Sequence, residues 1–473
     1  MQARSLYSTL YLVLFSTLAH ASSSDTAGTL SLPSLPQALY NGQGESAQWT
    51  GVGRLSWQNR LCIGTLLDTR DTPANASGPA YMLTAGHCTG GDNGKILADQ
   101  PASGSVAFNY FTDTTQQRHT VALKRTIWNS LQGTDLALLE LDTTLADLLA
   151  KGITPLKLGA SPASGREVQV VGEPSSVGKG LRLSQCTEHY QAMDTVDNRV
   201  MRHVRRNDCK GIDEGASGSP VVDPATGRLV SVVTSLHDTA VGAVPVQRVQ
   251  GCFTGGKADL DLEDCQLSPG FQLVQRQDSA FKTLTKARTL ADGSLEQPTW
   301  GFAFLIDTPR YRYKLTRDAL ACEDPTGYSG TIPSSEAVIE NPIGPEPGTH
   351  YLCIVGVQSP EQLSSPALMA NSLTLMTELL PPGRPQVQVT TAPLADGSIR
   401  VTWLKAPDVV FYRVKRGAPE LTDCDDHAGY RLLPGTQRVI PASQLPLKIC
   451  SVAIDLLMQS SAFQTDLLQV STP

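Results

Sequence analysis

The sequence predicts an all-β protein, and two observations support this fold class. Between residues 51 and 270, short apolar and β-branched runs such as 167–171 and 229–233 alternate with Gly, Pro, Asn and Asp. Such runs, separated by turn residues, are typical of the strands of a barrel or sandwich. The second observation is an internal repeat in the remaining sequence, whose two copies carry the Asp-Gly turns and short strand-like runs of small β-domains.

Length and composition limit the classes of protein that the chain can represent. Its 473 residues exceed one ordinary core, so we expect several domains. A hydrophobic content of 40% and a charged content of 18% indicate a folded protein. The net charge of −7 argues against binding to nucleic acid or to anionic membranes. We interpret the densest basic stretch, residues 202–206, as a solvated strand or loop face.

The N-terminal residues have the features of an export signal. After Arg4, residues 6–18 are apolar, and Ala19-His20-Ala21 has the form of a cleavage site, which predicts a signal peptide over 1–21. The apolar run is shorter than the roughly 20 residues of a membrane span, and no later segment is apolar enough. We therefore predict a secreted protein, extracellular or periplasmic. Residues 22–45, rich in Ser, Gly, Pro and Ala, are predicted to be a flexible lead or propeptide.

The ten cysteines agree with export. An even number in a secreted chain favours disulfides over metal sites, and no C-x-x-C pair supports a zinc ribbon. No phosphate-binding or dinucleotide-binding motif occurs either, so we expect no metal and no cofactor. The sequence does not fix the connectivity, but neighbouring cysteines suggest the pairs Cys62–Cys88, Cys186–Cys209, Cys252–Cys265, Cys322–Cys353 and Cys424–Cys450.

The internal repeat defines the C-terminal part of the chain. Residues 290–294 recur as 394–398, and residues 322–328 are echoed by 424–430. A period of about 100 residues is the size of a domain, so we predict two tandem β-sandwich domains, 271–380 and 386–473, joined by a proline-rich linker. They are loosely similar to fibronectin type III or immunoglobulin-like modules. Tyr328 and Tyr430, at matching positions, are interpreted as packed rather than displayed side chains.

Three motifs carry the elements of nucleophilic catalysis. Residues 81–88 end in Ala-Gly-His-Cys and supply His87, residues 133–139 supply Asp135 before a leucine-rich run, and residues 213–220 place Ser217 between glycines. A serine hydroxyl needs an adjacent base to act as a nucleophile, and a histidine fills that role. A buried aspartate would orient the imidazole. Gly215 can adopt backbone angles that aim its amide at an oxyanion, so the Gly215 and Ser217 amides are our candidate oxyanion hole.

Each motif, and their order along the chain, resembles the chymotrypsin-like (trypsin-like) serine peptidase family. The resemblance implies that residues 46–270 form two six-stranded antiparallel β-barrels with the site in the cleft between them. It also implies that a Cys62–Cys88 bridge clamps the histidine loop. Animal-type members carry an aspartate before the nucleophile that pairs with a new N-terminus, but this chain has Ala216 there. The Gly-x-Ser-Gly-Ser-Pro form is instead similar to the bacterial secreted branches.

The substrate pocket is less well specified by the sequence. By its offset from Ser217, Gly211 occupies the place of the pocket-base aspartate in trypsin-like members, which disfavours a Lys/Arg preference. Thr234 or Ser235 would support the aspartate and bind the substrate backbone. We interpret His237, which follows the same predicted strand, as a surface residue rather than a pocket histidine like that of glutamyl endopeptidases.

These expectations lead to one principal function and two alternatives. The principal function is a secreted serine endopeptidase that cleaves a protein or peptide substrate through an acyl-enzyme. The alternatives are a catalytically silent protease-fold binding or adhesion protein, and an esterase that uses the same triad. For the C-terminal domains, the alternatives are spacing or stabilisation of the enzyme and binding to substrate or to a surface.

Overall fold

A computed structural model describes residues 36–177, 179–237, 240–268 and 270–469 of the chain. The predicted signal peptide and residues 22–35 of the predicted lead lie outside this described part. Within the part of the chain that the structure describes, no helix has the length and apolar character needed to cross a membrane.

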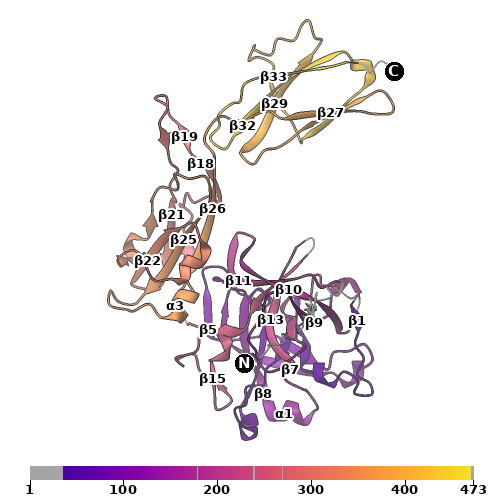
Figure 1. Cartoon of the computed structure of the whole chain (residues 1–473), viewed down its shortest axis with the longest axis vertical. Helices are drawn as coiled ribbons and strands as arrows, with labels where there is room; N and C mark the ends of the chain where they lie inside the picture. Colours follow the sequence, from indigo (N-terminus) through magenta and orange to yellow (C-terminus); the bar gives the residue numbers. More distant parts are fainter. Residues whose placement is uncertain (1–35, 178, 238–239, 269, 470–473) are drawn as a thin grey trace, which may run out of the picture. The chain divides into compact units, whose positions relative to one another are not determined.

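The first of two β-barrels is built from the sequence between Val52 and Thr144 (Figure 1). Its six antiparallel strands close into a cylinder because the last strand pairs with the longest one. Strand β5 (Ile96–Pro101) pairs with residues 125–130 of that longest strand, the same stretch that the last strand pairs with. In the order in which they pair, the six strands are β7 (His119–Ser130), β6 (Ser105–Phe108), β2 (Val52–Trp57), β3 (Arg60–Leu66), β4 (Pro79–Thr84) and β8 (Leu136–Thr144).

The second barrel closes in the same way, through the pairing of its first two strands. In pairing order its strands are β10 (Arg182–Val196), β11 (Arg199–Asn207), β14 (Val241–Pro245), β13 (Arg228–Leu236), β12 (Pro220–Asp223) and β9 (Arg166–Gly172). The N-terminal strand β1 (Gln37–Ala38) pairs with Leu183 and Arg182 of β10, so this part of the predicted lead is attached to the barrel. The predicted class of two six-stranded barrels is therefore confirmed.

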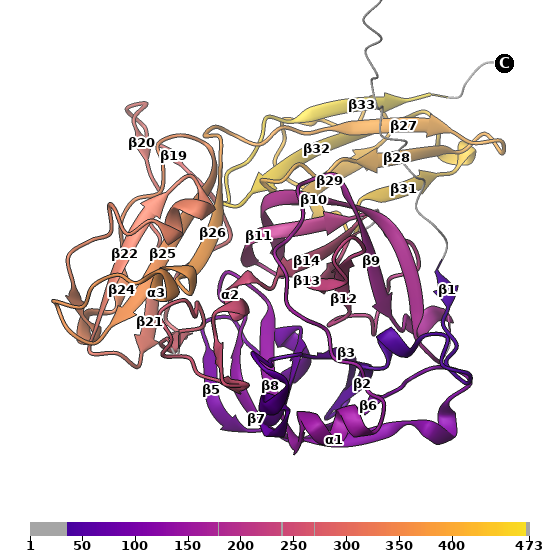
Figure 2. The same ribbon diagram turned by 60° about the horizontal axis from the view of Figure 1, so that its bottom comes forward.

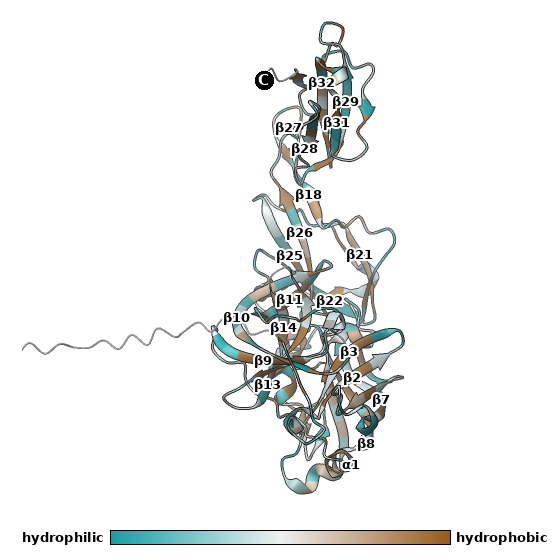
Figure 3. Cartoon of the chain, turned by 90° about the vertical axis from the view of Figure 1, so that its right-hand side faces the viewer, coloured by the Kyte–Doolittle hydropathy of each residue, from teal (hydrophilic) through white to brown (hydrophobic). Residues whose placement is uncertain are grey.

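Apolar side chains fill both barrels and the space between them. Val106, Phe108 and Leu139 belong to the core of the first barrel, whereas Val170 and Val233 belong to that of the second. A third cluster contains residues of both barrels, and it includes Ile63, Leu83, Val171, Leu229 and Val232. In Figure 3, brown hydrophobic stretches accordingly recur along the barrel strands. This shared core joins the strands that carry the candidate site.

We call residues 271–380 the first C-terminal module, and its strands form two sheets around one core. One sheet has the order β17 (Leu273–Gln275), β21 (Phe302–Ile306) and β24 (Val338–Ile339). The other has the order β18 (Leu284–Lys286), β26 (Leu373–Leu380), β25 (Gly348–Val357), β22 (Arg310–Thr316) and β23 (Ile332–Pro333). Strands β19 (Arg288–Thr289) and β20 (Leu295–Glu296) form a separate hairpin. Trp300, Phe304 and Leu352 belong to the core.

The second C-terminal module, residues 386–473, also has two sheets (Figure 2). They contain β27 (Val389–Pro393), β28 (Ile399–Trp403) and β31 (Gln437–Ile440), and then β30 (Arg431–Leu432), β29 (Val409–Gly417), β32 (Leu447–Asp455) and β33 (Gln464–Leu468). Tyr430 donates its hydroxyl to the carbonyl of Cys424 at 2.8 Å, and Tyr328 of the first module makes the same bond to Cys322. Both tyrosine hydroxyls are thus engaged by the backbone of their own modules.

Candidate active site

His87 lies in a short 3-10 turn (Gly86–Thr89) that directly follows β4. Buried Asn129, on β7, holds this turn because its side-chain amide donates to the carbonyl of Gly86 at 3.1 Å and to the hydroxyl of Thr89 at 3.0 Å. A Cβ on Gly86 would lie 2.8 Å from the side-chain oxygen Oδ1 of Asn129, so a glycine is required for this close approach. The turn leaves the imidazole half-buried at the edge of the barrel.

Asp135 directly precedes β8, and its side chain is only 4% exposed. One carboxylate oxygen accepts the backbone N–H of His87 at 2.9 Å, and the other lies 2.7 Å from Nδ1 of the same histidine. The carboxylate therefore favours the tautomer with hydrogen on Nδ1, which leaves Nε2 free to accept a proton. This is the arrangement that a general base requires.

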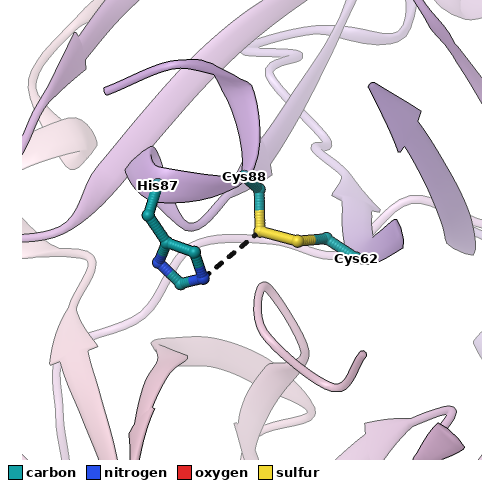
Figure 4. Close-up of side chains that lie close together, drawn as sticks. All are labelled: Cys62, His87 and Cys88. Atoms are coloured by element: carbon teal, nitrogen blue, oxygen red, sulfur yellow. Dashed lines mark hydrogen bonds between the residues drawn. A yellow bond between two sulfur atoms is a disulfide. The ribbon is translucent and has the colours of Figure 1, made fainter. Parts of the chain in front are cut away.

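A disulfide between Cys62 and Cys88 lies directly beside the histidine (Figure 4). It joins β3 to the residue after His87, and Nε2 of the ring faces its sulfur at 3.8 Å. His87, Cys62 and Cys88 come close enough together to resemble a metal-ligand group, but the two sulfurs are bonded to each other and offer no thiolate. The other bridges are the neighbour pairs Cys186–Cys209, Cys252–Cys265, Cys322–Cys353 and Cys424–Cys450.

Ser217 comes from the second barrel and is fixed between strands of both barrels. Its carbonyl accepts the N–H of Ile63, on β3, at 2.8 Å. The next residue, Gly218, donates its N–H to Val233 of β13 at 2.8 Å and has a φ of +87°. A Cβ at Gly218 would lie 1.9 Å from the Ile63 carbonyl oxygen, which explains why a glycine follows the serine. These contacts hold the backbone of Ser217 between the two barrels.

The amides around Ser217 are open to a ligand. Among the described residues, neither the N–H of Gly215 nor that of Ser217 donates to a protein acceptor, whereas Ala216 donates to Asp213 at 3.0 Å. Gly215 has a φ of +88°, a conformation that glycine adopts without strain. Two unpaired amides, one of the serine itself and one two residues before it, can bind a developing oxyanion.

His87 and Ser217 line one open cleft of about 1230 Å³. Among the described residues there is no hydrogen bond from the Ser217 hydroxyl to Nε2 of His87; such contacts often tighten only when substrate binds. The cleft exceeds the volume of most small-molecule sites. Its size suits a stretch of polypeptide better than a compact metabolite.

The comparison with protein families agrees with this geometry. Residues 64–232, which contain His87, Asp135 and Ser217, match the family model described as a trypsin-like peptidase domain. The chain carries a trypsin-like peptidase domain. We found no match to the sequence among curated proteins.

Solved structures of serine proteases resemble part of the chain. A thermostable serine protease, AL20, from an extremophilic microorganism is 16% identical over 42% of this chain and 92% of its own, with a TM-score of 0.32. The protease Anisep from Arthrobacter nicotinovorans is 17% identical over 42% of this chain and 91% of its own, with a TM-score of 0.31. The structure of Deg5 is 16% identical over 42% of this chain and 85% of its own, with a TM-score of 0.29. These TM-scores lie below 0.5, so the assignment rests on the family match.

Two of the three predicted pocket residues line the cleft of the trypsin-like domain. Thr234 and Ser235, at the end of β13, are lining residues, whereas Gly211 is exposed and lies outside the lining. A Cβ on Gly211 would lie 2.2 Å from a side-chain carbon of Pro36, so the N-terminal lead packs against this position. The hydroxyl of Thr234 faces the sulfur of Met201 at 3.9 Å. Within the described contacts, Asp135 is therefore held by His87 and not by Thr234 or Ser235.

Sequence reasoning missed a charged cluster behind the cleft wall of the trypsin-like domain. Asp194, on β10, is 4% exposed and binds Nε2 of His237 at 2.7 Å and the guanidinium of Arg206 at 2.9 Å. His237 is thus half-buried and paired, which differs from the expected free surface position. No local motif marks Asp194, because its partners lie 12 and 43 residues away in the sequence.

The interpretation of residues 202–206 as a solvated face is wrong. The side chain of Arg202 is 0% exposed, and that of Arg205 is 6% exposed. Arg205 donates to buried Glu188 at 2.9 Å within the second barrel, and Arg202 reaches Glu323 of the first C-terminal module at 2.8 Å. The basic stretch therefore consists partly of buried ion pairs that fix strands and modules.

Proposed function

We propose that the chain is a secreted serine endopeptidase that hydrolyses peptide bonds through an acyl-enzyme. The observation that carries this proposal is the 2.7 Å contact between His87 Nδ1 and Asp135, made at the edge of the cleft that Ser217 lines. The trypsin-like peptidase domain supplies the reaction class. Secretion is supported by the signal-like sequence at 1–21 and by five disulfides, which persist in oxidising compartments.

In the first half of this mechanism, Nε2 of His87 takes the proton of the Ser217 hydroxyl while its oxygen attacks the substrate carbonyl carbon. The carbonyl π bond opens, and the resulting oxyanion accepts hydrogen bonds from the amides of Gly215 and Ser217. Asp135 stabilises the imidazolium through the Nδ1–H contact. His87 then returns its proton to the amine that leaves, and an ester joins the acyl group to Ser217.

In the second half, a water molecule takes the place of the departed amine. His87 removes one of its protons while the water oxygen attacks the ester carbonyl, and the same two amides receive the negative charge. Collapse of this intermediate breaks the bond to Ser217 and returns the proton to the serine oxygen. The enzyme regains its starting state and the acyl half leaves as a carboxylic acid.

Matched peptide and ester substrates test the proposal. We expect the mature protein to cleave an unfolded protein at internal bonds, and Ser217→Ala to abolish that cleavage without changing the melting temperature. Ser219→Ala is the control, because it removes a serine hydroxyl two residues away from the candidate nucleophile. Cleavage of esters but of no peptide bond would indicate an esterase, and activity unchanged in Ser217→Ala would reject the triad.

A further inference from the structure

The cleft of the trypsin-like domain is bordered by residues of the first C-terminal module. Phe281, Lys282, Thr283 and Leu284 line the same cleft as His87 and Ser217. They precede and begin β18, an edge strand that pairs with β26 on one side. The first C-terminal module therefore forms part of the wall of the cleft.

This wall is anchored by a side chain buried at the junction of the two parts. The guanidinium of Arg202, from β11, donates to Glu323 at 2.8 Å, to the carbonyl of Ala370 at 2.7 Å and to that of Ser372 at 3.3 Å. It also donates to the hydroxyl of Thr374. One fully buried side chain thus satisfies four acceptors on three segments of the module, which fixes the module against the barrel.

Further hydrogen bonds attach the module close to the catalytic loops. Gln132, three residues before Asp135, donates its side-chain amide to the carbonyl of Asn371 at 2.9 Å. The N–H of Leu273 donates to the carbonyl of Gly94, seven residues after His87, at 2.6 Å. The module therefore holds a fixed position on both loops that supply the candidate base and its aspartate.

Both parts contribute apolar side chains to the cleft lining, beside charged ones such as Asp92, Glu214 and Lys282. The barrels contribute Leu131, Val196 and Leu236, and the exposed fraction of Leu236 is 44%. The module contributes Leu284 and Phe281, whose ring stacks on Trp300 at 5.9 Å and is thereby held by the module core. Apolar side chains within a mostly polar cleft can act as a subsite for one apolar side chain of an extended polypeptide.

The last residues of β13, beyond its pairing with β12, give such a polypeptide a defined path. Thr234 and Leu236 lie at the end of this strand, where β14 occupies one edge and the cleft the other. An extended chain can add to a free strand edge through its backbone, while pockets beside the edge select its side chains.

We propose that the first C-terminal module completes the substrate site, with Leu284 and its neighbours forming a subsite for an apolar side chain away from the scissile bond. This inference rests on the proposed endopeptidase function and names its substrate class, which is an extended, locally unfolded polypeptide with an apolar residue away from the cleaved bond. Folded proteins without such a segment would be poor substrates, because only an extended chain can reach both Ser217 and the module.

A binding measurement tests the subsite separately from catalysis. The full-length mature protein with Ser217→Ala would be titrated into fluorescein-labelled, reduced and carboxymethylated α-lactalbumin, and Kd read by anisotropy. We expect added Leu284→Ser to raise Kd about tenfold or more, as loss of an apolar contact in a specificity pocket does. Added Leu305→Ser is the matched control, because Leu305 is a 64% exposed leucine of the same module and lies outside the cleft lining.

A second variant guards against a loss of folding. Thr283→Trp adds bulk in the cleft without removing a buried group, so it should also raise Kd about tenfold while the melting temperature stays within the range of the control. Equal Kd values for the Leu284, Thr283 and Leu305 variants would overturn the inference, and so would the absence of binding by the Ser217→Ala parent. Failure of the proposed function shows itself differently, as a wild-type protein that binds the probe and does not cleave it.

Discussion

Arg202 of the trypsin-like domain donates its Nε–H to Oε1 of Glu323 in the first C-terminal module at 2.8 Å. The same guanidinium packs against the backbone of Gly133, where a Cβ would lie 2.3 Å from its Nη2, and the Arg202 N–H donates to the Gly133 carbonyl at 3.0 Å. Gly133 lies two residues before Asp135. The contact that docks the module therefore also supports the loop that carries the candidate catalytic aspartate.

Arg202→Ala should destabilise the protein strongly. Removing one partner of a buried ion pair leaves the other charge without compensation and typically costs about 3–5 kcal/mol. Here it also leaves the carbonyls of Ala370 and Ser372 without this donor. Urea unfolding should show the loss, and Arg199→Ala is the control, because Arg199 makes a long ion pair of 3.5 Å with exposed Asp197 and a local hydrogen bond to the Val196 carbonyl. Equal effects of the two changes would contradict a docking role.

Docking should weaken in acid. Burial alone raises the pKa of Glu323, but its hydrogen bond with His203 and the charges of Arg202 and Arg248 outweigh this and lower the pKa from 4.5 to about 2. A carboxylate whose pKa is depressed on folding contributes stability that is complete above its unfolded pKa and is lost as pH falls through its folded pKa. The contribution of Glu323 should therefore disappear between about pH 4.5 and pH 2.

Apparent melting temperatures of the wild type and of Glu323→Gln would measure this pH effect. The difference between them should be largest near pH 6 and shrink steadily below pH 4.5, because other carboxylates titrate in both proteins and cancel. Glu346→Gln, at an exposed position of the same module, should show a small difference at every pH. If the difference in melting temperature between the wild type and Glu323→Gln stayed constant down to pH 2, this would argue against the charged docking contact.

Two glycines beside Ser217 should respond differently to alanine. At Gly218 the added Cβ would meet the Ile63 carbonyl at 1.9 Å, so Gly218→Ala should lower the melting temperature and displace the serine. At Gly215 the nearest atom would be 3.5 Å away, so Gly215→Ala should fold. Because its φ of +88° is unfavourable for alanine, the amide should rotate and kcat should fall about 10²–10³-fold. Similar kcat values for Gly215→Ala and the wild type would exclude this amide from the oxyanion site.

Asp135→Asn should leave the fold intact and reduce turnover. The asparagine amide can no longer act as a double acceptor for the N–H and Nδ1–H of His87, so the wrong tautomer is favoured. In enzymes with this triad the change lowers kcat by about 10⁴. Steady-state kinetics would be compared with those of Asp142→Asn, which changes an exposed aspartate on β8. A reduction below tenfold would mean that Asp135 does not orient the base.

The features that sequence could predict are those encoded locally. Strands of the barrels are marked by β-branched runs between turn residues, and the motifs around His87 and Ser217 contain the glycines and the cysteine that their tight turns need. Neighbouring cysteines identified all five bridges because each closes a loop of 13 to 31 residues.

The features that sequence missed depend on distant packing. Arg202 lies in a basic, polar-looking stretch, yet its partners Glu323 and Thr374 are 121 and 172 residues away in the chain. Nothing near Leu284 marks it as part of a cleft, because it joins the cleft lining of Ser217 only through the docking of the module. Such contacts are set by how whole domains meet, which periodicity and motif spacing do not encode.

Active-site labelling tests the central claim most directly. The purified mature protein would be incubated with a fluorophosphonate, and the adduct located by intact mass and peptide mapping, with Ser217→Ala and Ser219→Ala run in parallel. We predict one adduct per chain, on Ser217, in the wild type and in Ser219→Ala, and none in Ser217→Ala. A folded wild-type protein that takes up no label, or takes it up elsewhere, would contradict an activated serine at this site.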